Sequence, residues 1–260
     1  TVPFLDDAAS PGGADDGVYA ATIPGQDAGL LVRYKIAASY GGVPFSLPAG
    51  DASYQYEGYV VKNPAVTSAL PIVEWFMDDA VYNDALANHR YDDYFNPGVV
   101  SYDGKVFDNA GFRIKGQTTR GMNPVSWNVE LPPGLFITFP GMPYPLKEFN
   151  LNRESEPNAA IAWETVRAAG NRGVFATPVR TQRNGQFHNI CDFLMSEDSV
   201  WRDAEKVKNW AIYKGGDRGN GLSTTSTWEA LQTGLRLDKK TRETEDWSDA
   251  WALTQAVDAP

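Results

Sequence analysis

Cysteine and histidine are scarce in this 260-residue chain, and their scarcity removes several kinds of site. Cys191 is the single cysteine, so no intrachain disulfide can form and a cysteine-rich metal site is excluded. We expect Cys191 to be a buried, inert thiol inside a strand. The two histidines, His89 and His188, are far apart in the sequence, which leaves a catalytic triad or a histidine-based zinc site little to build on.

Basic charge and long apolar runs are also lacking. The chain has 33 acidic and 23 basic residues, a formal net charge of -10. An acidic surface repels nucleic-acid phosphates and anionic lipid headgroups, so we expect no nucleic-acid partner. No apolar run approaches the roughly 18 residues of a membrane-spanning helix, and no membrane span is expected. The excess of acid is typical of a surface that keeps a protein soluble.

Apolar and aromatic residues are plentiful enough to build a core. The hydrophobic share is 42%, with eight Trp, twelve Tyr and twelve Phe. Between residues 1 and 62, turns rich in Gly and Pro separate three predicted strands, Val18–Ile23, Leu30–Ile36 and Tyr54–Val61. Short strands at this spacing indicate part of a β-sandwich. We place a domain boundary after residue 62, where Asn63–Val66 follows.

The second region, residues 63–260, mixes predicted strands with helices. Pro157 suits the first turn of a helix and Gly170 suits its end, so residues 157–169 are predicted to be helical. Asn184–Gly185 is a strong hairpin signal. The further predicted strands are Val106–Gly116, Val125–Leu131, Val179–Arg183 and Phe187–Leu194, and the further helices are Ser199–Lys208 and Trp247–Val257.

Two other patterns have ordinary explanations. The glycine-rich stretch Gly215–Gly221 lacks the strand-then-helix setting of a phosphate loop, so a flexible loop is the better interpretation. Asp6, Asp7, Asp15 and Asp16 fit no calcium-loop spacing and are read as solvated acids in turns.

One basic cluster stands out in this acidic chain. Arg113 and Lys115 share one face of a predicted strand, which runs into a glycine-flanked turn with Thr118, Thr119 and Arg120. We call these five residues the basic turn. Three cations and two hydroxyls around such a turn are what an anion such as a phosphate requires. A structural cluster of ion pairs explains the same pattern equally well.

The basic turn and several later stretches resemble the CotH family of atypical protein kinases, named for a spore-coat kinase. Residues 113–120 match the family's Arg-x-Arg/Lys-Gly-x-Ser/Thr-Ser/Thr-Arg stretch, and Lys147–Asn152 matches its Lys-x-Phe-Asn-Leu-Asn segment. A helix ending in Gly follows in both. The remaining matches, in order, are Arg183–Phe187, Ile212–Lys214, Lys239–Thr241 and Trp247–Asp249, so that the resemblance spans about residues 70–257.

The resemblance implies an α+β fold: a partial β-sandwich module over residues 1–62, followed by the amino-terminal portion of a CotH-like kinase domain over residues 63–260. Residues 1–62 look like part of the fibronectin type III-like module that often precedes such domains, with its first strands expected before Thr1. An extracytoplasmic, bacterial location is implied. The nucleotide- or anion-binding residues implied are Arg113, Lys115, Thr118, Thr119, Arg120 and Lys214.

Departures from the family pattern bear on catalysis. Pro124 and Val125 stand where the family has paired lysines, and Met195 stands where a Glu is expected, although Glu197 is near. The family's catalytic aspartates lie in two later segments, neither of which occurs before Pro260. We therefore expect a non-catalytic interaction or structural component with a protein partner, no catalytic residue, no metal ligand and no cofactor. The alternative is a fragment of an active secreted kinase, which would use ATP and a divalent metal.

Overall fold

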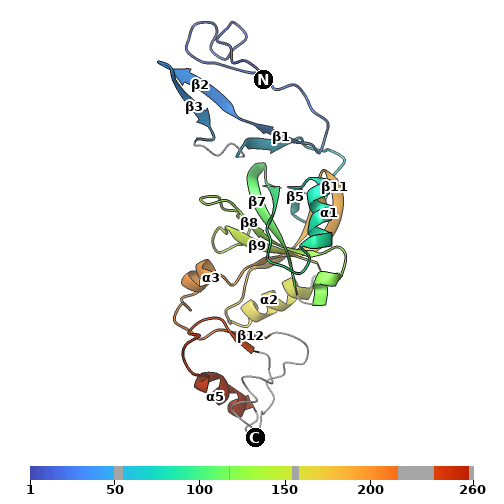
Figure 1. The fold of residues 1–260 in the computed structure, drawn as a ribbon, viewed down its shortest axis with the longest axis vertical. Coiled ribbons are helices and arrows are strands. Elements are labelled where there is room, and N and C mark those ends of the chain that lie inside the picture. Colours follow the sequence, from blue (N-terminus) through green and yellow to red (C-terminus); the bar gives the residue numbers. More distant parts are fainter. Residues whose placement is uncertain (50–54, 117, 154–157, 216–236, 258–260) are drawn as a thin grey trace.

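The centre of the protein is a β-barrel (Figure 1). The computed structural model describes residues 1–49, 55–116, 118–153, 158–215 and 237–257. Seven strands form the barrel in the order β10-β11-β9-β8-β7-β6-β5, and the parallel pairing of β5 with β10 closes it. All other neighbours in the barrel are antiparallel. The strands are β5 (Ile72–Phe76), β6 (Asn96–Tyr102), β7 (Lys105–Lys115), β8 (Ser126–Glu130), β9 (Glu148–Asn152), β10 (Ala176–Arg183) and β11 (Gln186–Met195).

Alternation along the strands decides which residues face the interior. Ile114 pairs with Trp127, and Trp127 pairs with Leu151 across the next strand. Leu151 in turn pairs with Phe193 of β11. Residues opposite each other in antiparallel strands point to the same face, so these four form one inward row. Each is at most 3% exposed, as burial on that face requires.

Aromatic rings fill much of the barrel interior. The Phe193 ring lies 4.8 Å from the Phe149 ring and 4.2 Å from the Phe139 ring, measured between centroids. At the other side of the core, Trp75 lies 5.4 Å from Phe112 and 5.8 Å from Trp127. Removing these large apolar surfaces from water is the main favourable contribution to folding.

Helices pack on the outside of the barrel. Asp78 caps α1 (Asp79–Asn88) by accepting from the Ala80 amide at 2.8 Å, and α1 packs on β6. The buried Asp192 carboxylate accepts from the Ala160 amide at 3.1 Å, near the start of α2 (Asn158–Ala168), which packs on β10 and β11. The remaining short elements are η1 (Thr118–Gly121), α3 (Ser199–Ala204), α5 (Ser248–Val257), β12 (Tyr213–Gly215) and β13 (Leu237–Lys239).

The amino-terminal strands form two small sheets. β1 (Leu31–Tyr34) pairs with β4 (Glu57–Val60), and β2 (Ile36–Tyr40) pairs with β3 (Val43–Leu47). The β1–β4 sheet is joined to the barrel by the buried Asp108 of β7. Arg33 Nε lies 2.9 Å from Asp108 Oδ1, and the Tyr56 amide donates to Asp108 Oδ2 at 2.8 Å.

The predicted fold class, an α+β arrangement of a partial β-sandwich module and the amino-terminal portion of a CotH-like kinase domain, is wrong. The described residues contain more strand than helix, and the largest sheet is a closed mixed barrel rather than a kinase lobe. The four amino-terminal strands form two separate two-stranded sheets, not two sheets packed face to face. The closing β5–β10 pair joins segments about a hundred residues apart, which local sequence patterns do not reveal.

Several local predictions are confirmed. The helix predicted at residues 157–169 is α2, although Pro157 lies outside the described residues. Asn184 and Gly185 have φ values of 50° and 77°, as the two-residue turn between β10 and β11 requires. The helix predicted at residues 199–208 is shorter, and the one at 247–257 is α5. The strand predicted at Val18–Ile23 is wrong, since only an isolated Leu5–Ala20 bridge forms there.

Other expectations are untouched by these findings. The domain boundary after residue 62 stays a prediction. Most of the glycine-rich stretch 215–221 lies outside the described residues. No helix in the described part of the chain has the length and apolar character needed to cross a bilayer.

Replacing Phe193 with alanine tests the aromatic core. Phe193 is 0% exposed, so Phe193→Ala should lower the free energy of unfolding by about 3–5 kcal/mol through lost burial and a residual cavity. Ile161→Ala, on the exposed face of α2 at 61% exposure, should change it by about 0.5 kcal/mol or less. Urea denaturation followed by circular dichroism measures both. Equal effects of the two substitutions would contradict the described core.

Candidate anion-binding site

The outward faces of β7, β8 and β9 carry a row of polar side chains. Arg113 pairs with Asn128, and Asn128 pairs with Asn150, so the three lie side by side across the strands. Arg113 Nη2 donates to Asn128 Oδ1 at 3.3 Å. Asn128 and Asn150 are buried, at 3% and 7% exposure, although they lie outside the barrel core. A buried amide needs fixed partners, so this row is an ordered polar surface.

Hydrogen bonds extend the row to Ser196, the residue that follows β11. Asn128 Nδ2 donates to Glu148 Oε1 at 2.8 Å and to Asn150 Oδ1 at 3.2 Å. Asn150 Nδ2 donates to Ser196 Oγ at 3.0 Å, and Ser196 Oγ donates to Glu148 Oε1 at 3.3 Å. Among the described residues, the Glu148 carboxylate is therefore stabilised by neutral donors rather than by a direct cation.

The two arginines of the basic turn share one acid. Arg113 Nη1 lies 3.0 Å from Asp93 Oδ1, and Arg120 Nη2 lies 3.8 Å from the same atom. Arg120 also donates from Nε to the Gly116 carbonyl at 2.7 Å, which fixes the turn after β7. Arg113 Nε is buried without a hydrogen-bond partner among the described residues. One exposed carboxylate thus serves two guanidinium groups, and one N–H donor remains unused.

Lys115 differs from the arginines. Burial, and after it the positive charge of Lys214, lower the pKa of Lys115 to about 8. Glu148 and Glu197 oppose this shift from a distance. Within the described ranges, no carboxylate forms an ion pair with the Lys115 ammonium. Lys115 is a partly desolvated cation beside other cations.

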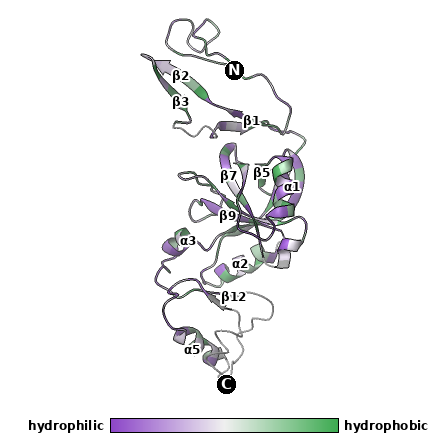
Figure 2. Cartoon of the chain, in the orientation of Figure 1, coloured by the Kyte–Doolittle hydropathy of each residue, from purple (hydrophilic) through white to green (hydrophobic). Residues whose placement is uncertain are grey.

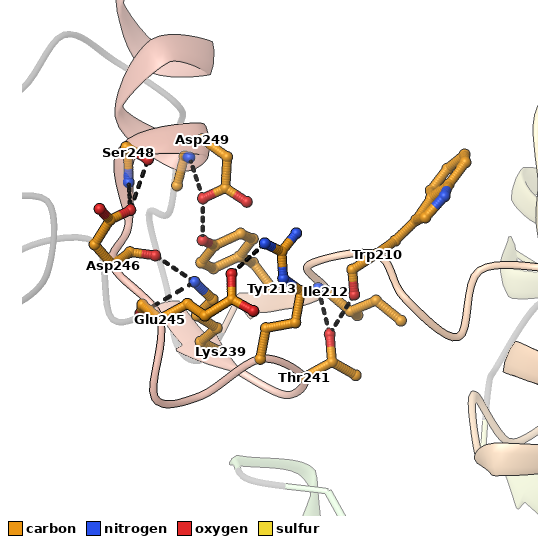
Figure 3. Close-up of polar contacts among 11 residues, drawn as sticks. Trp210, Ile212, Tyr213, Lys239, Thr241, Glu245, Asp246, Ser248 and Asp249 are labelled. Atoms are coloured by element: carbon orange, nitrogen blue, oxygen red, sulfur yellow. Dashed lines mark hydrogen bonds and ion pairs between the residues drawn. The ribbon is translucent and has the colours of Figure 1, made fainter.

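Lys214 reaches this region from β12. Residues of β13 and of the segment after it hold β12 in place (Figure 3). Lys239 Nζ donates to the carbonyls of Glu245 and Asp246 and lies 5.4 Å from the centre of the Tyr213 ring. Thr241 Oγ1 accepts from the Ile212 amide at 2.9 Å. These contacts anchor the strand that carries Lys214.

The sequence-predicted site residues are therefore brought partly together. Arg113, Lys115 and Arg120 lie around the end of β7, and Lys214 is close enough to lower the pKa of Lys115. Thr119 is exposed in η1 beside Gly116. Thr118 is also in η1, and its side chain lies outside the described residues. Ligand binding by this set stays a prediction.

The buried amides Asn128 and Asn150 are not among the site residues predicted from the sequence. Asn128 occupies an outward position between Trp127 and Val129, and Asn150 occupies the matching position between Phe149 and Leu151. A polar amide between two apolar residues of a strand points away from the core, which was a usable signal. What the sequence did not contain is the register that aligns them with Arg113.

The cysteine and the two histidines lie outside this site, and each has a structural environment of its own. Cys191 is buried, as expected, and burial raises the pKa of its thiol. Burial lowers the pKa of His188 to about 4, and the ring packs edge-on against Trp75. His89 Nδ1 lies 2.7 Å from Asp92. Among the residues that the structure describes, no group of three or more His, Cys, Asp or Glu side chains could hold a metal ion.

A separate cavity of about 610 Å³ lies between β1 and one end of the barrel. Two of its acids are already paired: Asp79 with Arg183 at 2.8 Å, and Asp108 with Arg33 at 2.9 Å. These two acids are neutralised by arginines, whereas the described residues around Lys115 keep an excess of positive charge.

Comparisons with known proteins add no assignment to this geometry: no family model matches the chain, and no curated protein is significantly similar to it.

Titration of Lys115 tests the electrostatics of this site. We expect the ammonium to titrate near pH 8, and Glu148→Gln to lower its pKa further because the carboxylate favours the charged form. NMR of selectively labelled lysine side chains measures this, with Lys115→Met identifying the resonance. Because the pKa is lower in the folded protein, the unfavourable contribution of Lys115 to stability should diminish as pH rises above 8. An ordinary lysine pKa would contradict the described burial.

Proposed function

We propose that this protein is a non-catalytic binding component whose basic turn, together with Lys214, holds a phosphate-type anion. The observation that carries the proposal is Lys115, a partly desolvated cation with no carboxylate at ion-pair distance among the described residues. Keeping a charged ammonium out of water is costly unless an opposite charge lies close by. A bound anion supplies that charge.

The neighbouring groups suit the same ligand. Arg113 and Lys214 lower the pKa of Lys115 by charge repulsion, and an anion placed among the three relieves it. Glu148 of β9 accepts hydrogen bonds from Asn128 and Ser196, and it forms no ion pair with a cation among the described residues. A structural ion-pair cluster accounts for Arg113 and Arg120 but leaves Lys115 unexplained.

The resemblance to the CotH family suggests the chemical identity of the bound anion. Residues 113–120 match the family's basic stretch, so the phosphates of a nucleotide are the proposed ligand, and an extracytoplasmic bacterial protein that binds a protein partner is the proposed setting. The described residues fit the phosphates, since Arg113, Lys115 and Lys214 are neighbouring cations. They do not fit a divalent metal, because Glu148 is engaged and Asp93 pairs with both arginines. An active kinase fragment is the alternative, supported by the motif alone.

Sulfate titration tests anion binding. Sulfate keeps its charge between pH 7 and 9, so any pH dependence of its affinity comes from the protein. We expect weak binding at pH 7 that falls at pH 9 as Lys115 loses its proton. Lys115→Met should weaken binding at least tenfold, which corresponds to about 1.4 kcal/mol. Isothermal titration calorimetry measures both effects.

The matched control is Lys105→Met, which removes the same charge from the exposed opposite end of the same strand. It should leave sulfate affinity unchanged. Equal affinity of the two variants, or an affinity that does not depend on pH, would refute the anion site.

Phosphoryl transfer separates the two functional candidates. The purified 260-residue chain should not phosphorylate itself or a generic protein substrate from ATP, with either magnesium or manganese present. Incorporation of radioactive phosphate is the measurement. Steady incorporation that Lys115→Ala abolishes would overturn the non-catalytic proposal in favour of the kinase alternative.

A further inference from the structure

The β2–β3 hairpin has one face that is entirely apolar. Three cross-strand pairs lie on it: Ile36 with Leu47, Ala38 with Phe45 and Tyr40 with Val43. Paired residues point to the same side and alternate residues do not, so these six share a face. The opposite face carries Ala37 with Ser46 and Ser39 with Pro44, which are small or polar. We call the first set the apolar hairpin face.

This face is open to solvent. The exposed fractions are 85% for Tyr40, 67% for Val43, 58% for Phe45 and 52% for Leu47. The hairpin projects away from the barrel (Figure 1), and Figure 2 shows hydrophobic residues along β3 and part of β2. A two-stranded hairpin is marginally stable by itself, and a contiguous exposed apolar patch of this size is typical of an interaction surface.

We propose that the apolar hairpin face is a dimer interface, covered by the same face of a second copy of this chain. The shape of the face fits itself. The central cross-strand pair sets the large Phe45 beside the small Ala38. A two-fold axis parallel to the strands places β2 of one copy over β3 of the other. Each Phe45 then lies over the Ala38 of the opposite copy. The large phenyl ring fills the space left by the small alanine, and the symmetry repeats this contact twice in the dimer.

Charge also favours this occupant. Residues 36–47 contain no Asp, Glu, Lys, Arg or His, so two copies can pack here without burying a charge. A charged ligand would find no ionic partner on the face. Elsewhere the chains repel each other, because each carries a formal net charge of -10. The dimer should therefore tighten when salt screens that repulsion.

The size of the face determines the strength of the dimer. The exposed parts of its four large side chains amount to roughly 500 Å² per copy, taking about 150–250 Å² for each aromatic side chain. Two copies bury about 1,000 Å², at the lower limit for a specific interface. We expect a dissociation constant in the micromolar range, with monomers at low concentration.

Sedimentation velocity of the full 260-residue chain, over a concentration series at low and at moderate salt, tests the proposal. The weight-average mass should rise from monomer to dimer with concentration, and the transition should move to lower concentration as salt increases. Phe45→Lys should hold the chain as a monomer throughout. Ala37→Lys adds the same charge to the opposite face and should leave the dimer intact. Circular dichroism checks that both variants keep the barrel.

An exchange of the two central residues tests the predicted fit. Ala38→Phe and Phe45→Ala should each weaken the dimer about tenfold or more, and the double variant should restore much of it because the large group and the hollow have changed places. A monomer at every concentration, or a dimer that Phe45→Lys and Ala37→Lys affect equally, would overturn the proposal. If the double variant weakens the dimer by the sum of the two single losses in binding free energy, the predicted packing is wrong.

Discussion

The parallel pairing of β5 with β10 is the contact on which the barrel depends. It joins Ile72 to Arg180 and runs to Trp75 opposite Arg183. Without it the remaining strands would form an open sheet with two unpaired edges. Asn184, just beyond β10, extends the pairing: its side-chain Oδ1 accepts from the Met77 amide at 3.0 Å, and its Nδ2 donates to the Met77 carbonyl at 2.9 Å. A side-chain amide thus substitutes for one more backbone pair beside the β5–β10 pair, which we call the seam of the barrel.

Closure also determines where a ligand can bind. A barrel of this size is filled by its own side chains, here the rings around Trp75 and Phe193. Binding groups must therefore lie on the outside, where the same alternation places Arg113, Asn128 and Asn150. The outward amides are held by one another and by Glu148 and Ser196, so the surface on which the cations lie is ordered. The rigidity of the proposed anion site is a product of the strand register.

The sequence was informative about local structure and poor at long-range pairing. Asn184–Gly185 identified its turn because only a few residues adopt positive φ easily, and Gly170 marked the end of α2 for the same reason. The inward side chains of β8 were readable from alternation. The barrel was not, because no residue near Ile72 indicates that its partner is Arg180. The supposed sandwich failed in the same way: the predicted strands Leu30–Ile36 and Tyr54–Val61 contain β1 and β4, but these two form a separate two-stranded sheet, and no strand forms at Val18–Ile23.

The candidate site shows the same division. Arg113 and Lys115 were assigned to one face correctly, because the period of a strand is short and regular. Their partners were not predictable: Asp93 comes from the segment between α1 and β6, and Lys214 comes from beyond α3. The loss of solvent around Lys115 depends on tertiary packing and has no signature in the local sequence. Charge patterns located the cluster, and only the fold determined which of its cations are neutralised.

The seam has a consequence for the order of events during synthesis on the ribosome. β5 to β9 emerge first and can pair as consecutive antiparallel neighbours, which leaves the free edges of β5 and β9 and an aromatic face open. The β10–β11 hairpin emerges later and fits between those edges, with β11 against β9 and β10 against β5. Until that hairpin leaves the exit tunnel, the nascent chain presents both edges to other chains. A chaperone that shields β5 and β9 would have its effect in this interval.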